Sequence, residues 1–273
     1  MIVLVTDSTA YLSQKEAQAL GVVQVPMTYT YEGRTLYTEG YIDEDEKVLQ
    51  TVADGVAHYT TAQASYSAFL STLEDILQDG NQALVLTISS RLSGTYANAR
   101  RAAQDLDSEK IVVVDSKATA GAMYLMLLKA REYVDSGLTL AEVAAKVKED
   151  REKTRTFFSV EDMAPLRKSG RLNFVRLSVS TILNIRPILK LTSGGVNAYA
   201  MARGRHEQIR LLAQAAAQCN VPVVVQHCRA DEMAEQLAQR LRGQGITVLQ
   251  RLLGPVLAIH LGSGCLSVAW MEK

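Results

Sequence analysis

The chain has 273 residues, of which 48% are hydrophobic and 21% charged, so a large buried core and an ordinary globular protein are expected. Its 29 basic and 29 acidic residues balance, which argues against general nucleic-acid binding and against a basic membrane-surface protein. The sequence contains no signal-peptide pattern, no apolar run long enough to span a membrane and no paired cysteine spacing. These features predict a cytoplasmic protein with free thiols.

The first half of the chain alternates between two patterns. Residues 1–6, 83–88 and 110–115 are continuous apolar runs, as in parallel strands buried on both faces. Residues 66–77, 121–134 and 140–153 instead have apolar residues at intervals of three and four, which predicts helices. Alternating strands and helices indicate an α/β layer with a parallel sheet.

After about residue 156 the pattern changes. Residues 156–160 and 196–202 resemble antiparallel strands, with a helix expected at 177–185 between them. A helix at 207–218, a strand at 221–228 and a helix at 231–244 follow, and the tail predicts two or three strands. We therefore expect two α/β domains, with a mainly parallel sheet in residues 1–155 and a mixed sheet in residues 156–273.

Polar residues follow each of the three predicted parallel strands, at 6–9, 89–95 and 115–119. Carboxyl ends of parallel strands meet at one sheet edge, where the following helices expose N–H groups that attract anions. Each stretch alone is also explained as a helix cap. Three in register favour a ligand crevice, for which the candidate residues are Ser90, Ser93, Gly94, Thr95, Asp115 and Ser116.

Several common chemistries lack a sequence signal. There is no phosphate-binding G-x-x-x-x-G-K-[ST] loop and no dinucleotide G-x-G-x-x-G after the first strand. The four histidines lack metal-ligand spacing, and Ser93 is not in a G-x-S-x-G elbow. Because only Arg91 and Lys117 lie close to these hydroxyls in sequence, a carboxylate fits the crevice better than a polyphosphate.

Charge is distributed unevenly along the chain. Residues 166–205 carry eight Lys or Arg and no acid, which predicts a local positive face unless folding scatters these cations. The cations of this stretch are Arg167, Lys168, Arg171, Arg176, Arg186, Lys190, Arg203 and Arg205.

Seven segments, in order along the chain, resemble the motifs of the DegV family, the bacterial fatty-acid-binding proteins that serve as carrier subunits of fatty acid kinase. The segments are VTDSTAYLS (5–13), TTAQAS (60–65), SSRLSGTYANA (89–99), VVDSKATAGA (113–122), APLRKSGRL (164–172), ILNIRPIL (182–189) and GPVLAIHLGSG (254–264). The resemblance implies two α/β domains with a long fatty acid, such as palmitate, stearate or oleate, buried between them.

The resemblance also implies site residues. Thr61, Ser93 and His260 would bind the fatty acid carboxylate, with Gln63 and Ser65 in the same crevice. The carrier would itself be no enzyme and would need no metal or other cofactor. It would present the carboxyl group to a separate ATP-dependent kinase, for phospholipid metabolism, and would make transient peripheral contact with membranes.

In this family the kinase docks on a basic surface, which here would include Arg171 and Arg203. Aliphatic residues 123–128 and 180–189 would line the acyl tunnel, although an ordinary core explains them as well.

The sequence departs from the family pattern at a few positions. TTAQAS stands in place of the usual T-S-Q-P-S, and Ser169 and Ser263 replace a common glycine and proline. None of these changes removes a proposed carboxylate ligand. Two other functions stay open: an acyl- or phosphoryl-transfer enzyme using Ser93 or His260, and a regulatory module for another small carboxylate.

Overall fold

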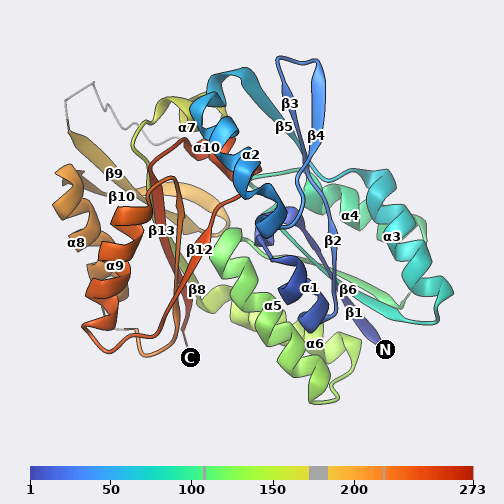
Figure 1. The fold of residues 1–273 in the computed structure, drawn as a ribbon. Helices are drawn as coiled ribbons and strands as arrows, with labels where there is room; N and C mark the ends of the chain where they lie inside the picture. Colours follow the sequence, from blue (N-terminus) through green and yellow to red (C-terminus); the bar gives the residue numbers. More distant parts are fainter. Residues whose placement is uncertain (107–108, 172–183, 218, 273) are drawn as a thin grey trace.

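The computed structural model describes residues 1–106, 109–171, 184–217 and 219–272, which form three β-sheets and the helices around them (Figure 1). Sheet A is parallel, with strand order β2-β1-β6-β7. Its strands are β1 (Ile2–Asp7), β2 (Val22–Val25), β6 (Gln82–Thr87) and β7 (Ile111–Asp115). The parallel strands expected from the three apolar runs are therefore confirmed.

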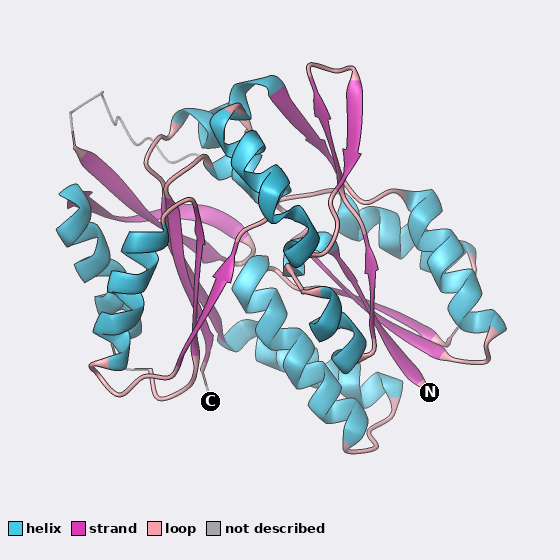
Figure 2. Ribbon diagram, in the orientation of Figure 1, coloured by secondary structure: helices cyan, strands magenta, loops and turns pink. Residues whose placement is uncertain are grey.

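Helices cover both faces of sheet A. Helices α3 (Tyr66–Gln78) and α4 (Thr95–Asp105) pack on one face, and α5 (Ala120–Asp135) and α6 (Leu140–Lys153) pack on the other (Figure 2). Strands buried on both sides have no solvent-facing positions to fill with polar residues, which explains their continuous apolar sequence. The short helix α1 (Gln14–Leu20) joins β1 to β2 and begins with a Ser13–Glu16 capping box.

Sheet C is mixed, with strand order β10-β9-β8-β13-β11-β12. Only β11 and β12 pair in parallel, and the other neighbours are antiparallel. The strands are β8 (Thr154–Ser159), β9 (Ile185–Thr192), β10 (Gly195–Arg203), β11 (Val223–Cys228), β12 (Val248–Leu252) and β13 (Cys265–Met271). The expected domain boundary near residue 155 falls within β8.

Helix α5 lies between sheets A and C, because it contacts β1 and β6 of the first sheet and β8, β11 and β13 of the second. Residues 120–127 are all buried, as expected for a helix covered on both sides. Helices α8 (Gly204–Ala216) and α9 (Asp231–Arg242) pack together and cover the opposite side of sheet C (Figure 1).

A third sheet was not expected from the sequence. Sheet B is antiparallel with order β4-β3-β5, formed by β3 (Thr28–Tyr31), β4 (Thr35–Thr38) and β5 (Tyr59–Ala62). Each strand has only four residues, too few for a reliable alternating pattern. Between β4 and β5 lie α2 (Ile42–Asp54) and the 3₁₀ turn η2 (Val56–His58), and another such turn, η1 (Ser8–Ala10), follows β1.

The end of the chain also differs from the expectation of strands alone. Helix α10 (Pro255–Leu261) separates β12 from β13, and its proline occupies the first helical position, where the missing N–H costs nothing. Helix α10 packs against α2, β5 and the short helix α7 (Ala164–Lys168). The helix expected at 177–185 lies outside the described residues up to 183, and Ile185 begins β9.

Candidate functional site

Thr61 and His260 meet at one end of an internal cavity. The Thr61 hydroxyl on β5 and Nε2 of His260 on α10 are hydrogen-bonded at 2.8 Å, although 199 positions separate them in the chain. Burial lowers the pKa of His260 to about 4, with a further contribution from the positive charge of Arg171. The imidazole is therefore neutral at neutral pH, with one N–H to donate.

Ser93 lies in the loop between β6 and α4. Its hydroxyl is 2.9 Å from the hydroxyl of Thr95, which is buried and accepts a hydrogen bond from the backbone N–H of Ala64. Beside Ser93, Gly94 packs directly under the Gln63 side chain: a Cβ at this glycine would lie 2.0 Å from Gln63 Oε1. A larger residue at this position would therefore force the Gln63 side chain to move.

The other predicted crevice residues hold their own loops together. Ser65 caps α3 by accepting from the backbone N–H of Ala68. Ser90 donates its hydroxyl and its N–H to the carboxylate of Asp115, and Ser116 is bonded within its own turn to Ala118. None of Ser65, Ser90, Asp115 and Ser116 lines the cavity, whereas Gln63 and Gly94 do.

The cavity has a volume of about 440 Å³, which is in the usual range for a small-molecule site. Thr61, Ser93, His260 and Arg171 line it together with mostly apolar side chains from sheets B and C, from α10 and from the segments that follow β6 and β7. The apolar residues are Met27, Ala62, Ile88, Leu92, Ala120, Phe158, Leu166, Leu191, Val196, Leu253, Val256, Leu257, Leu261 and Cys265. Residues 123–128, considered as tunnel lining, belong instead to the core around α5.

Arg171 lies at the cavity wall, which sequence reasoning did not anticipate. Its side chain donates to the carbonyl oxygens of Leu92, at 3.3 Å, and Ser169. Arg171, Thr61 and His260 also line a second, outer groove of about 430 Å³, bordered by α7 and η2. The three residues therefore lie between the inner cavity and the outer groove.

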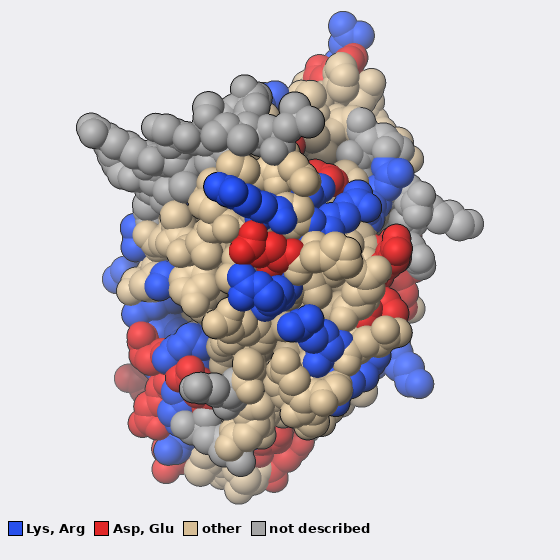
Figure 3. All heavy atoms as spheres, turned by 90° about the vertical axis from the view of Figure 1, so that its left-hand side faces the viewer, with Lys and Arg blue, Asp and Glu red and all other residues tan. Residues whose placement is uncertain are grey.

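Three other cations of the 166–205 stretch lie close together, because Arg186 pairs with Ala202 in the β9–β10 ladder, next to Arg203, and Arg205 follows two residues later. Arg186 and Arg205 both pair with Glu161. Arg203, at the end of β10, is exposed and does not line the cavity. Figure 3 shows one face of the molecule, on which basic and acidic side chains are interspersed. Arg176 lies outside the described residues. The positive charge near Arg203 is therefore partly neutralised by Glu161.

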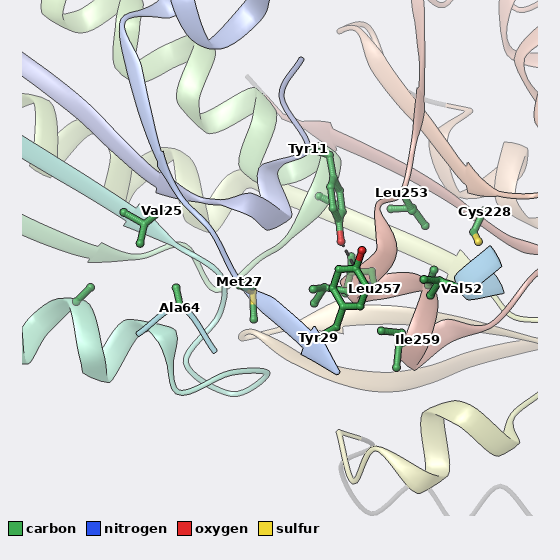
Figure 4. Close-up of a cluster of buried hydrophobic side chains, with 14 of the residues drawn as sticks. Tyr11, Val25, Met27, Tyr29, Val52, Ala64, Cys228, Leu253, Leu257 and Ile259 are labelled. Atoms are coloured by element: carbon green, nitrogen blue, oxygen red, sulfur yellow. Dashed lines mark hydrogen bonds between the residues drawn. The ribbon is translucent and has the colours of Figure 1, made fainter. Parts of the chain in front are cut away.

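A buried carboxylate holds helix α10 in place. Glu39 is fully buried, and its side chain accepts from the backbone N–H of Val256 at 2.7 Å and from the hydroxyl of Ser8 at 2.5 Å. The next N–H of the helix, that of Leu257, donates to the Tyr11 hydroxyl at 3.1 Å (Figure 4). Residues of the N-terminal half therefore accept hydrogen bonds from the otherwise unpaired backbone N–H groups in the first turn of the helix that carries His260.

The cluster in Figure 4 shows how the two halves of the chain join beside the cavity. Met27 from the N-terminal half and Leu253 and Leu257 from the C-terminal half belong to one buried cluster, and all three line the cavity. Burial of this shared apolar surface stabilises the arrangement that brings His260 to Thr61.

Other site chemistries have little support in the described parts of the chain. No group of three or more His, Cys, Asp or Glu side chains there is arranged to hold a metal ion. His227 accepts from the backbone N–H of Ala230, and His58 pairs with Glu32 on the surface. No described helix is both long and apolar enough to cross a membrane.

Comparison with known proteins gives a consistent result. A model for uncharacterised proteins of the DegV family matches residues 1–273. A DegV domain-containing protein from Halalkalibacterium halodurans is 29% identical, covering 100% of this chain and 99% of the relative. One from Deinococcus radiodurans is 31% identical, covering 78% and 75%.

Solved structures of similar proteins share the whole fold. A DegV family protein from Thermus thermophilus, described by its fatty acid binding, is 30% identical with a TM-score of 0.88, covering 100% of this chain and 99% of that one. A fatty acid binding DegV family protein from Streptococcus agalactiae has the same TM-score and coverage at 23% identity, which supports the fold alone.

Proposed function

The chain belongs to the DegV family, and on that premise we propose that it binds a long-chain fatty acid, such as palmitate, stearate or oleate, in the cavity lined by sheets B and C, α10 and the segments after β6 and β7. The observation that carries this proposal is a cavity in which the Thr61 and Ser93 hydroxyls and the His260 imidazole lie among mostly apolar side chains. The fatty acid binding of the Thermus thermophilus relative supports it.

In this proposal Ser93 and Thr61 donate hydrogen bonds to the carboxylate, and the single N–H of the neutral His260 donates to the Thr61 hydroxyl and so completes the network. A hydrogen bond to a charged group contributes about 1.5–3 kcal/mol, so two of them offset part of the cost of taking a carboxylate out of water. Because His260 is neutral at neutral pH, the nearby positive charge comes from Arg171. The buried tail adds about 0.8 kcal/mol per CH₂, before the costs of ordering the chain.

We further propose that the protein is a carrier and not the catalyst. A separate ATP-dependent kinase would reach the carboxyl group through the outer groove, where Thr61, Arg171 and His260 are shared with the cavity. There a carboxylate oxygen would attack the γ-phosphorus of ATP, so that an acyl phosphate forms and ADP leaves. Arg203, which is exposed, and Arg171 remain the proposed contacts for the kinase.

The acyl-transfer alternative gains nothing from the geometry of Ser93. That mechanism needs a base beside the Ser93 hydroxyl, but the described partner of this hydroxyl is Thr95, and His260 is bonded to Thr61. A serine without an adjacent base is a weak nucleophile.

Lipid binding is tested by extracting the denatured protein into organic solvent and identifying fatty acids by mass spectrometry. The delipidated protein is then titrated with palmitate and oleate. We expect about one acid per chain, and Ser93→Ala should weaken binding about 10-fold or more. Ser90→Ala is the matched control, because this hydroxyl is bonded to Asp115. An empty extract together with no uptake of either acid would refute fatty acid binding.

The carrier role is tested with a purified bacterial fatty acid kinase and ATP. Acyl phosphate should form only when both proteins are present. Arg203→Ala should lower this rate while bound lipid stays unchanged, whereas Arg171→Ala should affect both, since Arg171 lines the cavity. A normal kinase rate with Arg203→Ala would remove Arg203 from the docking surface, and acyl phosphate made without the kinase would show that the protein is an enzyme.

A further inference from the structure

The wall of the cavity carries three hydroxyl side chains besides those proposed for the carboxylate. Thr119 at the start of α5, Thr156 on β8 and Ser267 on β13 all line it. Their exposed fractions are 8%, 9% and 8%, so each is at least nine-tenths buried. We call these three residues the distal hydroxyl cluster.

The strand register places the cluster away from His260. Strands β13 and β8 pair antiparallel, with Ser267 opposite Phe158 and Thr156 opposite Ala269. Cys265, the first residue of β13, follows the helix of His260 by only a few residues. Residues two apart on a strand share a face, so Cys265, then Ser267, then Thr156 lie in this order along the cavity wall. The four residue-to-residue steps from 265 to 269 span roughly 13–14 Å.

The surroundings of the cavity agree with this order. Thr61, Arg171 and His260 also line the outer groove at the head-group end. Thr156 instead also lines a separate cleft, which contains none of these three residues. Helix α5, which begins beside Thr119, packs against both β8 and β13. The distal hydroxyl cluster therefore borders the part of the cavity expected to hold the acyl tail.

The hydroxyls of the cluster are poorly satisfied within the described chain. The Thr119 hydroxyl is buried without a hydrogen-bond partner, although this residue is at the N-cap of α5, where a hydroxyl usually caps the helix. The Thr156 side chain bonds no described group. The Ser267 hydroxyl donates to the carbonyl of Gln226 at 3.2 Å and keeps its lone pairs available. A saturated chain offers no partner to any of them.

We propose that the distal hydroxyl cluster is a subsite for an oxygen-bearing acyl chain, namely a fatty acid with a hydroxyl group far from its carboxyl. This inference rests on the proposed fatty acid binding. The chain hydroxyl would both donate to and accept from the cluster, with Thr156 as its main partner. A site with buried unpaired polar groups discriminates against a ligand that lacks the matching group.

Competition between stearate and a series of monohydroxystearates, each with its hydroxyl on a different carbon, tests the subsite on the delipidated full-length protein. We expect one position in the distal part of the chain to bind about 3–10-fold more tightly than stearate, the effect of one net hydrogen bond. Thr156→Val keeps the shape and β-branching of the side chain and should abolish this preference without weakening stearate binding.

Thr87→Val is the matched control. The Thr87 hydroxyl is also buried without a partner, but Thr87 does not line the cavity, so the preference should persist in this variant. Thr119→Val provides a second variant should Thr156→Val fail to fold.

Equal or weaker binding of every hydroxystearate, with stearate still bound, would overturn the subsite and leave the proposed function standing; the cluster would then hold water only. A preference that survives in both Thr156→Val and Thr119→Val would also overturn it. No binding of any of these acids would overturn the proposed function and the subsite together.

Discussion

At the proposed head-group end of the cavity Thr61, Ser93 and His260 come from three separate segments, whereas the proposed far end is formed largely by one face of sheet C. Thr61 is on β5, Ser93 follows β6 and His260 is on α10. Thr156 and Ser267, by contrast, lie on two adjacent strands held in register by backbone hydrogen bonds. The head-group end therefore depends on how separate elements pack, and the far end depends on one sheet.

This difference predicts that residues remote from the ligand matter more at the head-group end. The contact between Thr61 and His260 is made only if α10 is placed correctly on the N-terminal half. Loss of the contacts between Glu39 and α10 should therefore affect the head-group end more than the far end.

The largest effect is expected from Glu39→Ala. This change leaves the buried N–H of Val256 and hydroxyl of Ser8 without their acceptor, and we expect a loss of about 3 kcal/mol in the free energy of unfolding. Urea unfolding measures it, with the exposed Glu74→Ala as control. Fatty acid affinity should fall as well, because α10 carries His260. Unchanged stability and affinity would show that α10 is held by apolar packing alone.

The next effect concerns pH. The pKa of His260 is about 4 in the folded protein and 6.5 in an unperturbed imidazole. Between pH 4 and pH 6.5 this side chain is therefore protonated in the unfolded chain but neutral in the folded protein. Stability should therefore fall by about 2–3 kcal/mol as the pH drops from about 6.5 to about 4.

Urea unfolding at several pH values, compared between the wild type and His260→Gln, isolates this contribution from that of His227, whose pKa burial also lowers. The glutamine variant should lose less stability on acidification. Parallel curves for the two proteins would mean that His260 is already protonated, or solvent-exposed, in the folded state.

A smaller effect is expected at the far end. Val196 on β10 lines the cavity and is 4% exposed, so Val196→Ala removes two buried methyl groups and should cost about 2 kcal/mol. Because sheet C keeps its register, the carboxylate end should be unaffected, and a short-chain acid should bind as to the wild type. Weaker binding of a short acid would show that the two ends are coupled.

The smallest effect on stability is expected for Arg203→Ala. This exposed side chain should change the free energy of unfolding by less than about 0.5 kcal/mol. Thermal unfolding checks this value and shows whether any change in kinase rate comes from docking and not from misfolding. A large loss of stability would disqualify the variant as a test of docking.

Much of the architecture could be predicted from local pattern. The apolar runs at 1–6, 83–88 and 110–115 became β1, β6 and β7, because strands buried on both faces need apolar residues at every position. The helices at 66–77, 121–134 and 140–153 lie within two residues of α3, α5 and α6. Membership of the DegV family was also evident from the ordered motifs.

Local pattern failed where elements are short. The four-residue strands of sheet B and the seven-residue helix α10 are too short for a helical or strand period of apolar residues to be recognised. These elements are stabilised by the other elements that pack against them. The same holds for hydroxyls: Ser90 and Ser93 lie in one loop, but only Ser93 lines the cavity. A serine that caps and a serine that faces a ligand have the same local sequence signal.

The sequence by itself determined the α/β class, the order of the main strands and helices, and the residue types available for a carboxylate. Burial and helical or strand periodicity are properties of neighbouring residues, so a linear pattern records them. Only the tertiary structure decided that Thr61 meets His260, that Arg171 lies at the cavity wall and that three hydroxyls line its far part. These contacts join residues far apart in the chain, and they form because the shared buried core packs the elements that carry these residues against one another.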